Sequence, residues 1–277
     1  MIEPYKLTTP RSMSNAQTSR LRLRLLSDIH QEIHGRFEVV PHEEDAESVL
    51  VLPGDLHNPH DLIGWLIGLS YRFRALVVVP GNHDYYDVVM GEIEQRWVEA
   101  LAKAGISNVH LLCPGAATID HVRFIGATLW TDLRNADPLL CLDVQKILDF
   151  RRILVQTPRG RRPLTVDHWL STHAAHAEYL EAELRKPHPG PTVVVSHHLP
   201  CEQVSEEHRR AQRLQGAWAC SRLEPLIHEH RPALWCFGHT HNPVNMQIEG
   251  TRMLANPLGY VRIGEGLRFD DDLAIHL

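Results

Sequence analysis

The sequence contains few cysteines and few aromatic residues, and it has no long hydrophobic run. Its five cysteines are an odd number without a C-x-x-C pair, which excludes a disulfide framework and a zinc knuckle as the basis of the fold. No apolar stretch approaches the roughly 18 residues of a membrane-spanning helix, and residues 1–20 lack the apolar segment of a secretory signal. These absences favour a reducing, cytoplasmic location without a membrane partner.

Neither sign of charge dominates the chain. The 28 basic and 34 acidic residues leave a net charge of −6, which gives no general attraction to nucleic acid or to anionic membranes. Hydrophobic residues make up 43% of the chain, enough for a buried core, so a wholly disordered protein is excluded. Histidine is abundant, with 20 residues, and imidazole is both the commonest metal ligand and the side chain that titrates near neutral pH.

Hydrophobic patterning divides the chain into a tail and one domain. Residues 1–20 are polar and aperiodic, which predicts a flexible N-terminal segment followed by a single domain over residues 21–277. Leucines alternate with arginines over residues 21–25, a pattern that predicts a strand with one exposed face near a sheet edge. Short apolar runs predict buried strands at 48–52, 75–79, 192–195 and 233–237. Helices are predicted at 93–104 and from the N-cap Thr165 to Pro187.

Six shorter strands are predicted near 108–112, 117–119, 122–126, 245–248, 251–255 and 272–276, and turn pairs between them indicate hairpins. Strands that alternate with helices along most of the chain define an α/β layered fold.

Residues 131–163 do not fit this alternation, because they carry little strand signal and end in a segment with five arginines in 13 residues. We interpret the segment first as a solvated surface insertion, since charge runs usually are solvated. The alternative is a cap near residues 131–190 whose arginines, Arg159 among them, attract an anionic substrate.

Side chains that can bind metals follow five predicted strands, each time in the turn after the carboxyl end. The clusters are Asp28-Ile29-His30, Gly54-Asp55, Gly81-Asn82-His83-Asp84, Ser196-His197-His198 and Gly238-His239-Thr240-His241. Open α/β sheets place their ligand sites at such strand ends. Any one cluster is a weak signal, whereas all five in this order are specific.

This set resembles the five-part signature of the calcineurin-like metallophosphoesterases, which is D-x-H, G-D, G-N-H-D/E, a strand-terminal His, and G-H-x-H. All five parts are present between Asp28 and His241. Tyr85-Tyr86, residues 126–132, Asn256-Pro257 and Gly259-Tyr260 make the chain most similar to small bacterial members of uncharacterised substrate. The resemblance implies a layered β-sandwich of two mixed sheets flanked by helices, with a helical or irregular cap insertion.

The resemblance also implies two divalent metal ions as cofactors. One ion would be held by Asp28, His30 and His241, the other by Asn82, His197 and His239, and the Asp55 carboxylate would bridge them. Oxygen and nitrogen donors suit manganese, iron, nickel or zinc, and we expect manganese first. Two divalent ions balanced by two aspartates leave positive charge for a phosphate and a hydroxide.

The mechanism implied by the resemblance is hydrolysis of a phosphomonoester or small phosphodiester by direct attack of a metal-bridging hydroxide. His83 would be the general acid that protonates the leaving group, and Asp84 would orient its ring. A shift of strand phase by one residue would exchange the roles of His197 and His198. The family pattern favours His197 as the ligand and leaves His198, with Arg159, as a tentative substrate contact.

Two other functions stay open from the residues alone. A nuclease would use the same metals and acid, although the net negative charge and the lack of a basic stripe with aromatics oppose it. A non-catalytic protein-binding scaffold would be expected to have lost metal or acid positions, and none is lost here. The sequence gives no sign of the oligomeric state.

Overall fold

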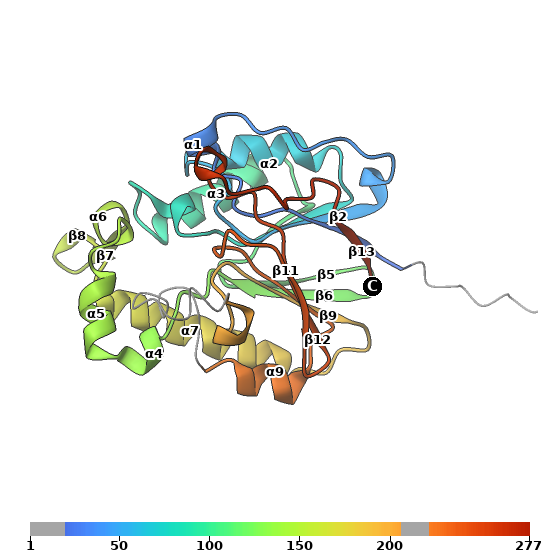
Figure 1. Ribbon diagram of the computed structural model, residues 1–277. Helices are drawn as coiled ribbons and strands as arrows, with labels where there is room; N and C mark the ends of the chain where they lie inside the picture. Colours follow the sequence, from blue (N-terminus) through green and yellow to red (C-terminus); the bar gives the residue numbers. More distant parts are fainter. Residues whose placement is uncertain (1–19, 206–221) are drawn as a thin grey trace, which may run out of the picture.

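The computed structural model describes residues 20–205 and 222–277. Two sheets stack face to face, and helices cover the outer face of each (Figure 1). The expected α/β sandwich of two mixed sheets flanked by helices is therefore confirmed. Except for Arg20, the N-terminal segment expected to be flexible lies outside the described residues.

The first sheet has the strand order β13-β1-β2-β3-β4. Its parallel strands are β1 (Arg22–Leu25), β2 (Ser48–Leu52), β3 (Ala75–Val78) and β4 (Val109–Leu111), and β13 (Ala274–His276) runs antiparallel to β1. The helices that follow these strands are α1 (Gln31–His34), α2 (Leu62–Ser70) and α3 (Glu92–Lys103). The continuous apolar runs of β2 and β3 are buried, as expected for parallel strands covered on both faces.

Strand β1 differs from its prediction, because it is an inner strand without an exposed face. The C-terminal strand β13 covers the edge on which β1 was expected to lie. Arg24 is only 1% exposed, and its Nη1 lies 2.6 Å from Asp45 Oδ1. Arg22 donates to Ser48 Oγ at 2.9 Å. The alternating arginines thus mark buried ion pairs and hydrogen bonds made with residues far along the chain.

The second sheet has the order β11-β12-β10-β9-β6-β5. Its strands are β5 (Gly115–Ile119), β6 (Val122–Ala127), β9 (Thr192–Ser196), β10 (Leu234–Cys236), β11 (Val244–Ile248) and β12 (Thr251–Ala255). The two edge strands form the predicted hairpins with β6 and β12, and the four inner strands are parallel. The hairpin prediction was wrong for β4 and β13, which pair with β3 and β1 across long connections.

Helices α7 (Val166–Leu184) and α9 (Glu224–His230) lie under the second sheet in Figure 1. Thr165 caps α7 as predicted, accepting a hydrogen bond from His168 N at 3.3 Å. Four 3-10 turns complete the described elements: η1 (Asp45–Glu47), η2 (His83–Tyr85), η3 (Glu202–Val204) and η5 (Val261–Ile263). Among residues 20–205 and 222–277, no helix has the length and apolar character needed to cross a membrane.

Residues 131–163 form an arm at one end of the sandwich (Figure 1). The arm contains α4 (Leu133–Ala136), α5 (Pro138–Val144), α6 (Asp149–Arg152) and the hairpin of β7 (Leu154–Thr157) and β8 (Gly160–Pro163), which the low strand signal did not predict. Its side chains Phe150 and Ile153 belong to the same buried cluster as Ile93 and Trp97 of α3. The arm is therefore packed onto the first layer, whereas α7, within the expected 131–190 insertion, contacts β6 of the second sheet.

Candidate metal centre

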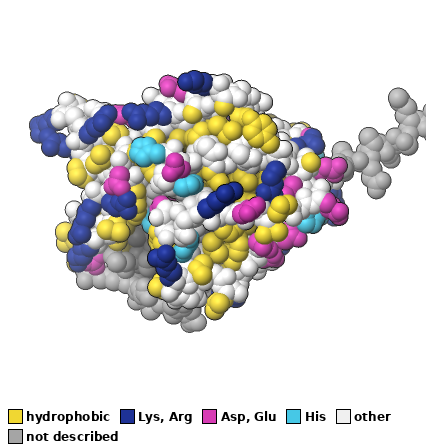
Figure 2. Space-filling view, turned by 90° about the horizontal axis from the view of Figure 1, so that it is seen from above, with side chains coloured by type: hydrophobic (Ala, Val, Ile, Leu, Met, Phe, Trp, Pro, Cys, Tyr) yellow, Lys and Arg dark blue, Asp and Glu magenta, His cyan; other side chains and the backbone are white. Residues whose placement is uncertain are grey.

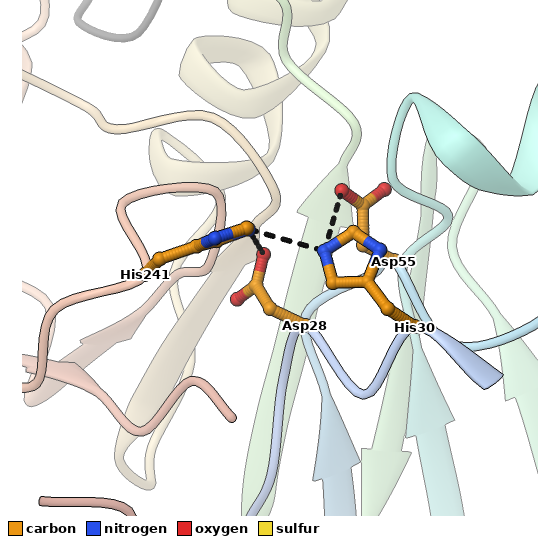
Figure 3. Close-up of side chains that lie close together, drawn as sticks. All are labelled: Asp28, His30, Asp55 and His241. Carbon is orange, nitrogen blue, oxygen red and sulfur yellow. Dashed lines mark hydrogen bonds and ion pairs between the residues drawn. The ribbon is translucent and has the colours of Figure 1, made fainter. Parts of the chain in front are cut away.

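The carboxyl ends of β1, β2, β9 and β10 bring most of the predicted ligands together between the two sheets (Figure 3). Asp28, His30, Asp55 and His241 form one group whose ligand atoms all lie within 4.8 Å of one another. Asp55, His197 and His239 form a second group by the same measure. Asp55 belongs to both groups, as expected for a carboxylate that bridges two ions.

The distances within the groups are those of a compact site. Asp55 Oδ2 lies 3.7 Å from His30 Nε2 and 3.5 Å from His197 Nε2. The Nε2 atoms of His30 and His241 are 3.1 Å apart, and so are His197 Nε2 and His239 Nδ1.

Hydrogen bonds on the far side of three histidine rings determine which nitrogen faces inward. The Nδ1 atoms of His30, His241 and His197 lie 2.8, 2.6 and 2.8 Å from Glu32 Oε1, Glu265 Oε2 and the Pro53 carbonyl oxygen. These oxygens can only accept, so each Nδ1 carries a proton, and each Nε2 presents a lone pair when the imidazole is neutral, which is the form that binds a metal.

Two lone pairs 3.1 Å apart cannot bond to each other, but both can bind a cation placed between or beside them. Asp28 Oδ2 is also buried without a hydrogen-bond partner among the described residues. The nitrogen and oxygen donors present here therefore fit divalent metal ions.

The backbone at the site adopts conformations that non-glycine residues rarely take. Five of the seven predicted ligands have left-handed φ angles: Asp28 (52°), His30 (50°), Asp55 (55°), His239 (64°) and His241 (51°). Such positions cost on the order of 1 kcal/mol or more each and persist where the surrounding structure enforces them. Five such residues at one place indicate that the surrounding fold holds the backbone of this site in conformations that it would not adopt by itself.

Gly81 allows two of the motif loops to touch. A Cβ atom on Gly81 would lie 2.1 Å from Asp55 Oδ1, so only glycine fits beside the bridging carboxylate. Asp55 Oδ1 accepts a hydrogen bond from His83 N at 2.9 Å, which links the same two loops. The glycines of these motifs therefore serve close approach between backbone segments.

His83 lies beside the first group and is held from three sides. Its Nδ1 is 3.0 Å from Glu32 Oε1, its Nε2 is 3.3 Å from the Tyr260 hydroxyl, and its ring stacks on Tyr86 with centroids 4.4 Å apart. Burial lowers the pKa of His83, but the carboxylates of Asp55 and Glu32 outweigh it and raise this pKa to about 9. Burial raises the pKa of Glu32, but the hydrogen bonds and charges of His30 and His83 outweigh it and lower this pKa to about 2.

The third group of possible metal ligands is formed by His30, Glu32 and His83. Its nitrogen-to-oxygen distances of 2.8 and 3.0 Å are those of hydrogen bonds, and His30 already turns its other nitrogen towards Asp55. We therefore interpret Glu32 as a carboxylate that orients two imidazoles.

Asp84 does not orient His83, contrary to the expectation from sequence. Its carboxylate accepts four backbone N–H bonds of 2.7–3.1 Å, from Asp55, Leu56, His57 and Gly81. The tight η2 turn directs adjacent side chains to different sides, so Asp84 points back to the loop after β2. Its role here is to fix that loop, while Glu32 takes the role expected of Asp84.

The structure does not bring His198 or Arg159 into the groups. His198 is fully buried, its Nδ1 lies 3.1 Å from the Thr128 carbonyl oxygen, and its ring lies against Trp130 and Trp169. Burial lowers the pKa of His198, as is typical of a neutral core histidine. Arg159 is exposed at the turn of the β7-β8 hairpin, and no hydrogen bond or ion pair of the described residues links its side chain to the site.

Several residues at the site were not among the residues that the sequence analysis assigned to it. Glu32, Glu265 and Asp149 contribute carboxylates, and Tyr86 and Tyr260 pack against His83. Glu32, two residues after His30, could have been found from its place on the same turn. Asp149 and Glu265 could not, because only folding brings them to the strand ends.

The fold and the site define a family, the calcineurin-like phosphoesterases, whose model matches residues 21–243. The chain belongs to this family. Uncharacterized protein L509 of Acanthamoeba polyphaga mimivirus is 21% identical over 262 residues, covering 86% of this chain and 91% of that protein. The crystal structure of phosphopantetheinyl hydrolase (PptH) from Mycobacterium tuberculosis superimposes with a TM-score of 0.65 and 17% identity, covering 94% of this chain and 96% of that one. This second likeness shows a shared fold.

Family membership and the clustered ligand atoms together support a metal-dependent phosphoesterase.

Proposed function

We propose that the protein is a phosphohydrolase with two metal ions, which acts on phosphomonoesters or small phosphodiesters. The observation that carries this proposal is the shared carboxylate: Asp55 belongs to both groups of possible ligands. Asp28, His30 and His241 would hold one ion, Asn82, His197 and His239 the other, and manganese remains our first expectation. When bound, such a pair supplies an activated water and positive charge that stabilises the phosphoryl group.

The residues around this pair have separate tasks in the proposed reaction. His83 would donate the proton that the leaving oxygen needs, because it lies at the edge of the first group without being required as a ligand. Glu32 and the Tyr86 ring would keep the imidazole in place. The Tyr260 hydroxyl, 3.3 Å from His83 Nε2, marks the side on which a leaving group would meet the acid.

The arginines of the arm are proposed to attract the anionic substrate. Basic side chains gather at the left of Figure 2, the side on which Figure 1 labels β7 and β8. Arg152 and Arg161 are ion-paired with Asp87 and Glu92, so the attraction would come from the arm as a whole and from Arg159 at its tip.

A metal-resolved substrate panel tests the proposal. Apo-protein is reconstituted separately with manganese, iron, nickel and zinc, and each form is assayed on nitrophenyl mono- and diesters, on a phosphopantetheinyl diester, and on single-stranded and duplex nucleic acid. We expect metal-dependent release of nitrophenol from at least one small ester. Cleavage of nucleic acid alone would favour the nuclease function. If no substrate is hydrolysed with any metal, the proposal is refuted and the non-catalytic scaffold is favoured.

Replacement of His83 by alanine tests the acid. We expect kcat to fall by about 100-fold or more for an alkyl phosphate, whose leaving group needs a proton, and by much less for nitrophenyl phosphate. His60→Ala, at an exposed loop position, serves as the control and should change neither rate. Equal losses of His83→Ala on both substrates would contradict the assignment.

A further inference from the structure

Helix α6 of the arm places a buried carboxylate behind the metal centre. Asp149 is 2% exposed and is the first residue of α6, far in sequence from all five motifs. Its Oδ1 accepts hydrogen bonds from Asn82 Nδ2 at 3.1 Å and from the Tyr86 hydroxyl at 2.6 Å. A residue of the arm therefore touches a predicted metal ligand directly.

The bond to Asp149 decides which end of the Asn82 amide faces the site. A carboxylate can only accept, so it selects the NH₂ group and turns the amide oxygen the other way. That oxygen lies 3.0 Å from His197 Nε2, and His197 Nδ1 lies 2.8 Å from the Pro53 carbonyl oxygen, to which it donates. When His197 is neutral, which is the form that binds a metal, both of these atoms are acceptors, and a cation bound by the two makes the arrangement favourable.

Without the carboxylate, the opposite orientation of Asn82 would be preferred beside a neutral His197. A flipped Asn82 would donate an N–H bond to His197 Nε2 and so occupy the lone pair that a metal needs. The same flip would remove the amide oxygen from the ligand set. A single rotation of the Asn82 amide would thus prevent both Asn82 and His197 from binding a metal ion.

We propose that Asp149 is a positioning residue that locks Asn82 with its oxygen towards the metal, so that docking of the arm completes the second metal site. The inference rests on the proposed two-metal function and adds a residue outside the family motifs to it. It also gives the arm a role that does not depend on its arginines, namely to make metal affinity conditional on the packing of α6.

The test compares Mn²⁺ binding, measured by calorimetry, in variants that remove the carboxylate. Tyr86→Phe is the matched control, because it removes the other bond to Asp149 and should leave the affinity of both ions unchanged. Adding Asp149→Leu to that background should weaken one of the two ions by about 10- to 100-fold, the usual cost of losing a partner that orients a ligand. The tyrosine change also ensures that no hydroxyl is left without its acceptor.

A rescue variant makes the test specific to amide orientation. Asn82→Asp presents an oxygen whichever way it turns, so it should restore binding when added to Tyr86→Phe/Asp149→Leu. In Tyr86→Phe alone, where Asp149 would face a second carboxylate, the same change should give no gain. If the double variant folds poorly, Asp149→Asn replaces it in the test. An asparagine amide can present either its oxygen or its NH₂ group to Asn82, so it selects the orientation of Asn82 less strictly. We therefore expect a smaller loss of affinity for the same ion.

Unchanged affinity on loss of Asp149, or equal effects of Asn82→Asp in both backgrounds, would overturn the inference. These outcomes differ from a failure of the proposed function. Wild-type protein that binds no Mn²⁺ would refute the metal centre itself, whereas wild-type protein that binds Mn²⁺ and hydrolyses no ester would refute only the activity.

Discussion

At the scale of single residues, hydrogen bonds turn the Nε2 atoms of three predicted ligands, His30, His197 and His241, towards the centre of the site. Glu32, Glu265 and the Pro53 carbonyl fix three histidine rings by accepting a hydrogen bond from the Nδ1 atom of each. Ligand orientation by such outer partners is general in metal sites, and here the partners come from loops on different strands. The predicted ligands could be named from the sequence because each lies in a short motif, and Glu32 lies close to one of them. Glu265 could not be predicted, because only folding brings it to His241.

Asp84 gives a stability prediction at this scale. Asp84→Asn should lower the free energy of unfolding by about 3 kcal/mol, because an amide offers one acceptor oxygen and turns N–H donors against the buried backbone N–H groups that the carboxylate now satisfies. Urea unfolding measures the change. Glu99→Gln, which removes the same charge from an exposed position of α3, should be neutral. Equal stability of Asp84→Asn and wild type would contradict the role given to this residue.

At the scale of elements, the positions of strands and helices along the chain were easier to predict than which strands pair with one another. The apolar runs of β2, β3, β9 and β10 identified buried strands, and the family resemblance supplied the two-sheet sandwich. The inner place of β1 was missed, because it depends on β13 about 250 residues later and on the buried carboxylate of Asp45. The β7-β8 hairpin was missed for a different reason: its exposed arginines hide the alternation of a strand.

The buried arginine of β1 gives a prediction for this element. Arg24→Met should lower the free energy of unfolding by about 2–3 kcal/mol, because it leaves the Asp45 carboxylate in the core with Arg72 as its remaining cationic partner. Chemical denaturation is the measurement, with Arg162→Met on the exposed strand β8 as a control of near-zero effect. Equal stability of Arg24→Met and wild type would contradict the stabilising role given to the Arg24–Asp45 pair.

At the scale of the whole molecule, the proposed metal pair joins the two sheets. Asp28, His30 and Asp55 follow strands of the first sheet, whereas His197, His239 and His241 follow strands of the second. Ligands from both layers exist together only in the folded protein, so metal binding should stabilise the fold as a whole. The five motifs implied this convergence, since the strand ends of a layered sandwich meet at one edge.

Metal removal should therefore lower the melting temperature. An ion at 100 times its Kd adds about 2.7 kcal/mol, so Mn²⁺ should raise the Tm of chelated protein by about 5–10 °C. Differential scanning calorimetry before and after Mn²⁺ addition measures this shift. Asp55→Asn, which weakens the shared ligand, should lose most of the increase; a shift of the same size in this variant would show that Mn²⁺ binds elsewhere.

The most direct test of the account is anomalous diffraction from crystals grown in saturating Mn²⁺. We predict two anomalous peaks about 3.5–4 Å apart, one bound by Asp28, His30 and His241, the other by Asn82, His197 and His239, with the Asp55 carboxylate between them. A single peak, no peak, or an ion held by Glu32 and His83 would contradict it.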